Sequence, residues 1–320
     1  MEIGKSIAFA ALGCCLAGSD QAAASDINYT GPLLTPNANI LPKGMVSVEP
    51  YLVYSSSRHY YDDNGRKQSQ SPRTQWQTLL PMAIGISDRF GMQAVLGAAH
   101  TQTGGRRSAG MRVNDTSLRA QFLLLRPSAD GHSPALSLSA IHRFPTGRHD
   151  RLDDNPLNGS GSGAHSDRLD LLIQQSITMP SGRPLRWRGR LLYDFAPGSV
   201  NVSGRSVYGT PAGFRGKAYP GHAWTVAGSA EYSVDAHWVM VMELSYQRSS
   251  ASRVLGGVTD ATGVTPYQSL PSPGYNLSIA PAIEYNINSR LGIIGGVHMS
   301  VAGRNSSAFV APQIAVNMLF

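Results

Sequence analysis

The chain has 320 residues, of which 27 are Lys or Arg and 20 are Asp or Glu, giving a net charge of +7. Outside the extreme N-terminus it contains no run of 18 apolar residues, which excludes a helical membrane protein. The positive charge is not gathered into a Lys/Arg run or a basic helix, so we expect no nucleic-acid partner.

The N-terminus has the pattern of an export signal. Lys5 supplies a positive charge, residues 7–17 form an apolar run, and residues 22–24 are three alanines that fit a cleavage site. We therefore expect residues 1–24 to be a cleaved signal peptide and residues 25–320 to form a single domain.

Both cysteines, Cys14 and Cys15, lie inside this signal. The mature chain would then need no disulfide while it crosses an oxidising periplasm. Two alternatives stay open, a short buried helix and a lipoprotein cleavage box at Cys14.

Apolar and polar residues alternate in twelve segments along the chain. A strand that crosses a bilayer needs about 9–11 residues, with one face toward lipid and the other toward the lumen. In the clearest segment, 274–286, Leu277 and Ile283 would face lipid, while Asn276 and Glu284 would face inward. The twelve segments are 45–56, 75–87, 91–102, 116–126, 134–145, 168–179, 185–195, 224–234, 238–247, 274–286, 291–301 and a last one that ends at Phe320.

Strands of a soluble β-sandwich also alternate, but two features favour a membrane barrel. Long connections, at 57–73, 103–114, 147–167, 198–221 and 249–272, take turns with short ones. Aromatic residues mark both ends of the lipid face, with Tyr54, Trp76, Tyr193, Trp224, Tyr246 and Tyr275 in one girdle and Phe90, Trp187, Tyr232, Trp238, Tyr285 and Phe320 in the other. We predict an all-β fold, a transmembrane antiparallel barrel of about twelve strands closed by the C-terminal strand, in the outer membrane of a Gram-negative bacterium.

Several charged side chains point into the lumen by strand parity. They are Arg186, Arg188 and Arg190 on one segment, Glu231, Glu243 and Glu284 on the three that follow, and Arg119 and Arg168 elsewhere. We expect a basic wall facing an acidic wall in the lower half of the lumen. Either the charges pair and fill a narrow interior, or they form a field that selects solutes, with the Arg ladder contacting a carboxylate or phenolate.

The connection 147–167 combines acidic residues with a Gly/Ser run. Asp150, Asp153, Asp154 and Asn155 are oxygen ligands of the kind Ca²⁺ prefers, although their spacing matches no standard loop. The Gly/Ser run could instead fold into the lumen as a constriction. An ordinary solvated loop is the simplest alternative.

Catalytic candidates are His142, His149 and His165, which have Ser and Asp residues nearby in the sequence. None of them forms a local catalytic signature. The chain also lacks a phosphate loop, a CxxC pair, zinc-ligand spacing and a dinucleotide fingerprint. We therefore expect no enzyme activity, no cofactor and no metal.

The chain resembles the outer-membrane barrel family named for the meta-pathway of phenol degradation. The resemblance is carried by GPLLTPNAN at 31–39, LPKG at 41–44, GISDRFGM at 85–92, FPTGRHD at 144–150, SVYGT at 206–210 and GFRG at 213–216. It implies a barrel through which hydrophobic or aromatic compounds pass, and it implies no binding residues. In such barrels the assembly machinery recognises a C-terminal aromatic residue, here Phe320.

The leading hypothesis is a porin-like transporter, in contact with outer-membrane lipids, for passive passage of small aromatic or organic-acid solutes. The alternative is a closed structural or adhesive barrel that acts through its external loops. An outer-membrane enzyme is the third option. The lumen distinguishes them, since an open path favours transport and a filled lumen favours the structural role. A His–Ser or His–Asp pair at the outer rim would favour the enzyme.

Overall fold

The computed structural model describes residues 29–128 and 133–320, so the predicted signal peptide and both cysteines lie outside the described residues. Regular structure in this part is almost entirely β-strand, apart from a 3-10 turn at Pro156–Asn158. None of the described residues belongs to a helix long and apolar enough to cross a membrane.

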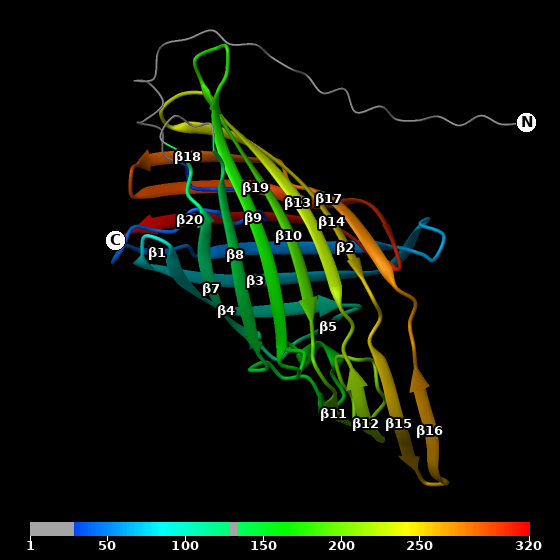
Figure 1. The fold of residues 1–320 in the computed structure, drawn as a ribbon. Coiled ribbons are helices and arrows are strands. Elements are labelled where there is room, and N and C mark those ends of the chain that lie inside the picture. The colour runs from blue at the N-terminus through cyan, green and yellow to red at the C-terminus, as the bar shows by residue number, and fades with distance from the viewer. Residues whose placement is uncertain (1–28, 129–132) are drawn as a thin grey trace, which may run out of the picture.

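Twelve antiparallel spans form a closed barrel, as predicted (Figure 1). The last span pairs with the first, so that Ile314 lies opposite Leu52 and Leu319 lies opposite Ser47. Closure leaves no open edge inside the bilayer. In chain order the spans are β1 (Val46–Val48) with β2 (Tyr51–Tyr61), β3 (Lys67–Ser87), β4 (Phe90–Thr103), β7 (Thr116–Leu125), β8 (Ala135–Phe144), β9 (Ser166–Thr178), β10 (Pro184–Phe195), β13 (Ala223–Ser233), β14 (Trp238–Ser249), β17 (Gly274–Ile279) with β18 (Ala282–Asn288), β19 (Leu291–Arg304) and β20 (Ser306–Leu319).

Prolines interrupt two of the spans. The segment 274–286, predicted as one strand, is divided at Pro281, and the first span is divided at Pro50. Proline has no N–H to give to the ladder, so the strand pairing stops there. Neighbouring strands still bond across both breaks, because Val297 donates to the Pro281 carbonyl and Glu49 donates to the Pro81 carbonyl, each at 3.0 Å.

The outer surface of the barrel is apolar, whereas the inner surface carries the charged and polar side chains together with some apolar ones. On β14 the side chains alternate in exposure, with Met240, Met242 and Leu244 exposed at 59, 51 and 53% and Val239, Val241 and Glu243 at 0, 4 and 0%. A soluble protein would place its apolar residues the other way round. This inversion identifies the outer face as the one that meets lipid.

Both aromatic girdles form through contacts between neighbouring strands. At one end the ring centroids of Tyr193 and Trp224 lie 4.3 Å apart, and at the other end those of Trp238 and Tyr285 lie 4.6 Å apart. The first end carries the long connections and is called extracellular, following the usual orientation of such barrels. The second end carries the short turns and the C-terminus and is called periplasmic.

Four connections predicted as long loops contain strands. The β2–β3 hairpin continues beyond the barrel, so its turn covers only 62–66, and the connection 103–114 holds the short strands β5 (Arg106–Arg107) and β6 (Arg112–Val113). A separate four-stranded sheet forms from the last two connections, in the order β11 (Val200–Ser203), β12 (Phe214–Tyr219), β15 (Arg253–Asp260) and β16 (Gly263–Ser269). This order follows the order of the spans β10, β13, β14 and β17 that carry it.

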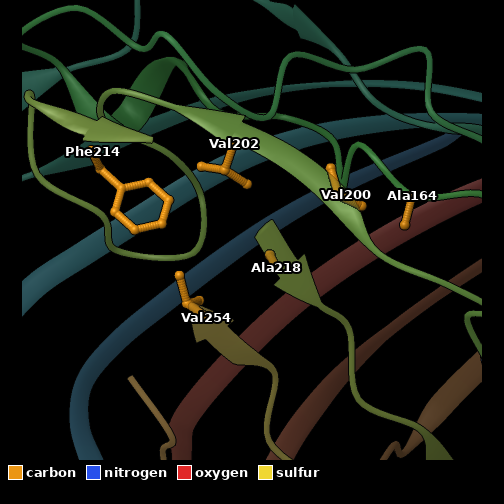
Figure 2. Close-up of a cluster of buried hydrophobic side chains, with 6 residues drawn as sticks. All are labelled: Ala164, Val200, Val202, Phe214, Ala218 and Val254. Atoms are coloured by element: carbon orange, nitrogen blue, oxygen red, sulfur yellow. The ribbon is translucent and has the colours of Figure 1, made fainter. Parts of the chain in front are cut away.

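The four-stranded sheet has its own hydrophobic core (Figure 2). Phe214 is 1% exposed and packs among Val202, Val254 and the ring of Tyr267, at a centroid distance of 5.3 Å. Ala164, from the connection 147–165, belongs to the same cluster. We call the sheet, together with residues 147–165 and the β11–β12 connection 204–213, the extracellular cap.

Truncating Phe214 should loosen the extracellular cap and leave the barrel intact. Removal of a buried phenyl ring costs about 3–5 kcal/mol through lost transfer energy and a residual cavity. We expect Phe214→Ala to accelerate limited proteolysis within the connections 198–221 and 249–272 while the protein keeps the heat-modifiable electrophoretic mobility of a folded barrel. Val264→Ala, at a side chain that is 70% exposed, is the control and should change neither property. Equal proteolysis of Phe214→Ala and the unaltered protein would contradict this account of the cap.

Candidate functional site

Residues 29–45, which we call the inner segment, run inside the periplasmic half of the lumen. Leu33 and Tyr29 pack against the buried cluster of Val239, Val241, Ala282, Ile294 and Ala315. Ala38 and Ile40 pack against a second cluster with Leu123, Ala135 and Leu172. The lumen is therefore filled at this level by the chain's own N-terminal residues.

Two buried carboxylates of the barrel wall hold the backbone of the inner segment. Glu243 accepts hydrogen bonds from the Leu34 and Thr35 amides and from the Thr35 hydroxyl, each at 2.9 Å. Glu284 accepts from the Thr30 amide at 2.9 Å and from the Gly31 amide at 3.1 Å. Both glutamates are 0% exposed, so these bonds satisfy carboxylates that water cannot reach.

The arginines of β10 bond the other side of the inner segment. Arg188 donates to the Thr35 carbonyl at 3.1 Å, and Arg190 donates to the Leu34 carbonyl at 3.2 Å. The guanidinium of Arg186 lies 3.9 Å from the centre of the Tyr29 ring. Basic and acidic side chains, as predicted from strand parity, thus both form hydrogen bonds with the backbone of the inner segment.

Glycines in the wall make room for the inner segment. A Cβ on Gly292 would lie 2.0 Å from the Thr30 hydroxyl oxygen. A Cβ on Gly85 would lie 2.2 Å from the carbonyl oxygens of Leu41 and Pro42. Any larger residue at either position would push the segment away from the wall.

Three carboxylates on the lumen wall are each shared by two arginines. Glu231 lies between Arg186 and Arg188, with the Arg186 Nε at 2.9 Å and the Arg188 Nε at 3.0 Å. Asp170 lies between Arg190, at 2.9 Å, and Arg119, at 3.1 Å. Asp194 lies between Arg168, at 2.7 Å, and Arg143, at 3.7 Å.

The exposure of these charges rises toward the extracellular end. The side chains of Arg186 and Arg188 are 9 and 4% exposed, whereas those of Arg143 and Arg168 are 28 and 26% exposed. Glu243 and Glu284 further neutralise the lower arginines. Above that level, Arg119, Arg143 and Arg168 share Asp170 and Asp194, and Arg190 at the boundary between the two levels also bonds Asp170. These four arginines thus outnumber the two carboxylates.

A cavity of about 600 Å³ occupies the extracellular half of the lumen, and we call it the upper-lumen cavity. Its wall is formed by inward-facing residues of β3, β4, β7, β8 and β9, including Arg143 and Arg168. Its roof is formed by Leu157, residues 159–162 and Val207 of the extracellular cap. A second hollow of about 850 Å³ lies on the cap itself, between residues 151–154 and strands β12 and β15.

Hydrogen bonds fix the roof of the upper-lumen cavity. Asp115 accepts from the Gly147 amide at 3.0 Å and from the Ser162 amide at 2.7 Å, and Tyr208 donates to the Ser162 carbonyl at 2.6 Å. Burial raises the pKa of Tyr208 to about 12, and the nearby charge of Asp115 acts in the same direction. The phenol is therefore neutral and a donor at physiological pH. The connection 147–167 thus lies over the lumen, ordered rather than solvated throughout.

All eight sequence-predicted site residues face the lumen, at two levels. Six of them, Arg186, Arg188, Arg190, Glu231, Glu243 and Glu284, surround the inner segment. Arg119 pairs with Asp170 above that level, and Arg168 lines the upper-lumen cavity. Sequence analysis missed the inner segment, although residues 31–39 stood out as a motif, and it missed the contributions of Leu157 and Val207.

The acidic residues of the connection 147–167 do not converge. Asp150 accepts from the Ser203 amide at 2.9 Å, and Asp153 pairs with Arg148 at 3.1 Å. Asn155 caps the 3-10 turn and also donates to the Arg107 carbonyl. Across residues 29–128 and 133–320, no group of three or more His, Cys, Asp or Glu side chains could hold a metal ion.

The three catalytic candidates take part in other contacts. His142 lies 2.7 Å from Asp167 and 3.0 Å from His165, so both of its ring nitrogens are used without a hydroxyl group. His149 lies 3.3 Å from the Asn201 carbonyl oxygen. A His–Asp pair is thus present at the extracellular rim, but it has no serine or cysteine nucleophile among its described partners.

No family model and no curated protein matches the chain. Among solved structures, the COG4313 outer membrane channel from Pseudomonas putida F1 is similar over 90% of this chain and 100% of that chain, with a TM-score of 0.65 and 12% identity. The chain thus has the fold of an outer-membrane β-barrel. Weaker likenesses include the NanC porin, at 10% identity over 85% of this chain and 98% of that chain with a TM-score of 0.45. A TodX monoaromatic hydrocarbon channel mutant gives 8% identity over 87 and 90%, with a TM-score of 0.41.

Removal of the Glu243 carboxylate should release the inner segment. A single cysteine, Leu34→Cys, in the chain beginning at Ser25 reports its accessibility to a water-soluble maleimide. We expect Glu243→Leu to speed labelling roughly tenfold or more, because three hydrogen bonds to a charged acceptor are lost.

Two variants control this measurement. Glu243→Gln keeps one acceptor oxygen and should have a smaller effect, and Ser245→Ala, two residues further along the same lumen-facing row, should have none. Labelling of Leu34→Cys that is equally fast with Glu243 in place would show that the carboxylate does not hold the segment.

Proposed function

We propose that this protein is an outer-membrane channel through which small aromatic or organic-acid solutes pass passively. The observation that carries the proposal is the combination of a lipid-facing apolar wall with a lumen that keeps a cavity of about 600 Å³ beside partly exposed arginines. A barrel built only as a surface platform has no need for uncompensated charge in its interior. The solute would enter through the extracellular end, beneath the cap.

The arginines in the extracellular half of the lumen would be the first to attract such a solute. Arg119 and Arg168 belong to the group of four arginines that shares two aspartates, so the extracellular half of the lumen attracts anions. A solute would contact the lower set of charges only where the inner segment moves aside. This set consists of Arg186, Arg188 and Arg190 with Glu231, Glu243 and Glu284. Passage thus depends on the hydrogen bonds that hold residues 30–35.

A closed structural barrel is the second candidate function, and the filled periplasmic half of the lumen is the observation that favours it. In that case the extracellular cap would be the active surface. A role as an enzyme has less support, because His142 lacks a nucleophile among its described contacts. The absence of enzyme activity stays a prediction.

The proposal includes export and assembly. Residues 1–24 would direct the chain to the periplasm of a Gram-negative bacterium, and the barrel-assembly machinery would recognise the last strand and Phe320. Outer-membrane lipids would surround the apolar face. The solute is the only other partner that the proposal requires, and no cofactor is involved.

Single-channel recording in planar bilayers tests the proposed function. In a salt gradient we expect discrete conductance steps and a reversal potential that indicates anion preference. Arg119→Gln combined with Arg168→Gln should bring the chloride-to-potassium permeability ratio toward one, because two positive charges leave the lumen. Arg126→Gln, at an exposed periplasmic arginine, is the matched control and should leave the ratio unchanged. Silence from protein that electrophoresis shows to be folded would reject the channel and support the closed barrel.

A further inference from the structure

The upper-lumen cavity has a polar side with surplus positive charge. Arg112, Arg143 and Arg168 line it, and they stand against Asp115 in the lining and Asp194 beside it. Asp115 is turned toward the roof, where amides of Gly147 and Ser162 bond it. One positive charge in this cavity is therefore uncompensated.

The same arginines keep unused hydrogen-bond donors. A guanidinium has five N–H groups. Arg168 donates from Nε to Asp194 at 2.7 Å, and Arg143 donates from Nε to Ser166 at 2.9 Å while its Nη2 lies 3.7 Å from Asp194. The Nε of Arg112 is buried without a hydrogen-bond partner among the described residues. An oxyanion in the cavity would meet several unsatisfied donors at once.

The rest of the lining combines polar side chains, such as Gln75, Gln77 and Asn114, with four large apolar ones. Leu79 and Val95 come from the barrel wall, and Leu157 and Val207 come from the extracellular cap. A volume of about 600 Å³ lies within the usual range of small-molecule sites. A bare inorganic anion would leave these four side chains without a partner, and a neutral hydrocarbon would leave the arginines without one.

We propose that the upper-lumen cavity is a binding site for a small organic anion with an apolar body. The carboxylate of the ligand lies on Arg143 and Arg168, and its apolar body lies against Leu79, Val95 and Leu157. This inference rests on the proposed function only in that the ligand reaches the cavity from the extracellular side of the lumen. Binding itself requires no movement of the inner segment.

Calorimetric titration of the refolded full chain in detergent micelles with benzoate tests the site. Benzyl alcohol, of similar size and uncharged, and acetate, charged but almost without an apolar body, are the comparison ligands, and ligand-into-micelle titrations are subtracted. We expect benzoate to bind at least tenfold more tightly than either. Arg143→Gln with Arg168→Gln should weaken benzoate at least tenfold, since charge-assisted hydrogen bonds are lost.

Two further variants keep the test sound. Val207→Trp, at a side chain that is 42% exposed, leaves every arginine in place and should abolish benzoate binding by filling the cavity. Arg126→Gln should bind benzoate as the unaltered chain does. If the Arg143 and Arg168 double variant fails to fold, Val207→Trp alone decides, and undiminished binding would overturn the proposed site.

The outcomes separate this site from the channel. Equal affinity for acetate and benzoate would reduce it to a site for simple anions, and equal affinity for benzyl alcohol would reduce it to an apolar pocket; either result overturns the proposal. Anion-selective conductance without benzoate binding would reject the site and keep the channel. Benzoate binding that depends on Arg143 and Arg168, in a protein that conducts no current, would keep the site and reject the channel.

Discussion

The structure depends on one constraint, that backbone N–H and C=O groups inside a bilayer must be paired within the protein. The closed ladder of twelve spans meets it, and where Pro50 and Pro281 interrupt the ladder the neighbouring strands still bond across the gaps. A barrel wall that is hydrogen-bonded all the way round has little conformational freedom. What the barrel can do is therefore decided by the side chains and segments that occupy its lumen.

The same need to pair backbone groups explains why charged side chains surround the inner segment in the periplasmic half of the lumen. At its end the inner segment bonds the backbone of Gly85 in β3. Residues 30–35 are instead bonded by side chains, with Glu243 and Glu284 on one flank and Arg188 and Arg190 on the other. Ionised partners form stronger hydrogen bonds than neutral ones. The charges that strand parity predicts are thus largely structural at this level, and their mutual attraction also offsets the cost of burying them.

The upper lumen differs because its charges are unequal and partly exposed. Asp170 and Asp194 each serve two arginines, and Arg143 and Arg168 lie open to a cavity roofed by the extracellular cap. The two interpretations of the lumen charges, structural and solute-selecting, therefore apply to different depths of one barrel. The extracellular cap belongs to the upper level, because it places apolar side chains opposite the arginines there.

The sequence by itself determined the number of spans, the direction in which their side chains point, and the positions of the girdles, because a period of two is a local property that each strand displays independently. It predicted that Arg186 and Glu243 face inward, and both contact the inner segment in the structure. Only the tertiary structure decided what they meet: Thr35 and Glu243 are separated by 208 residues, and no local pattern relates them. The cap likewise combines strands from two connections with Ala164 from a third. Local periodicity fixes which way a residue faces, whereas contacts across the lumen arise only once the barrel has closed.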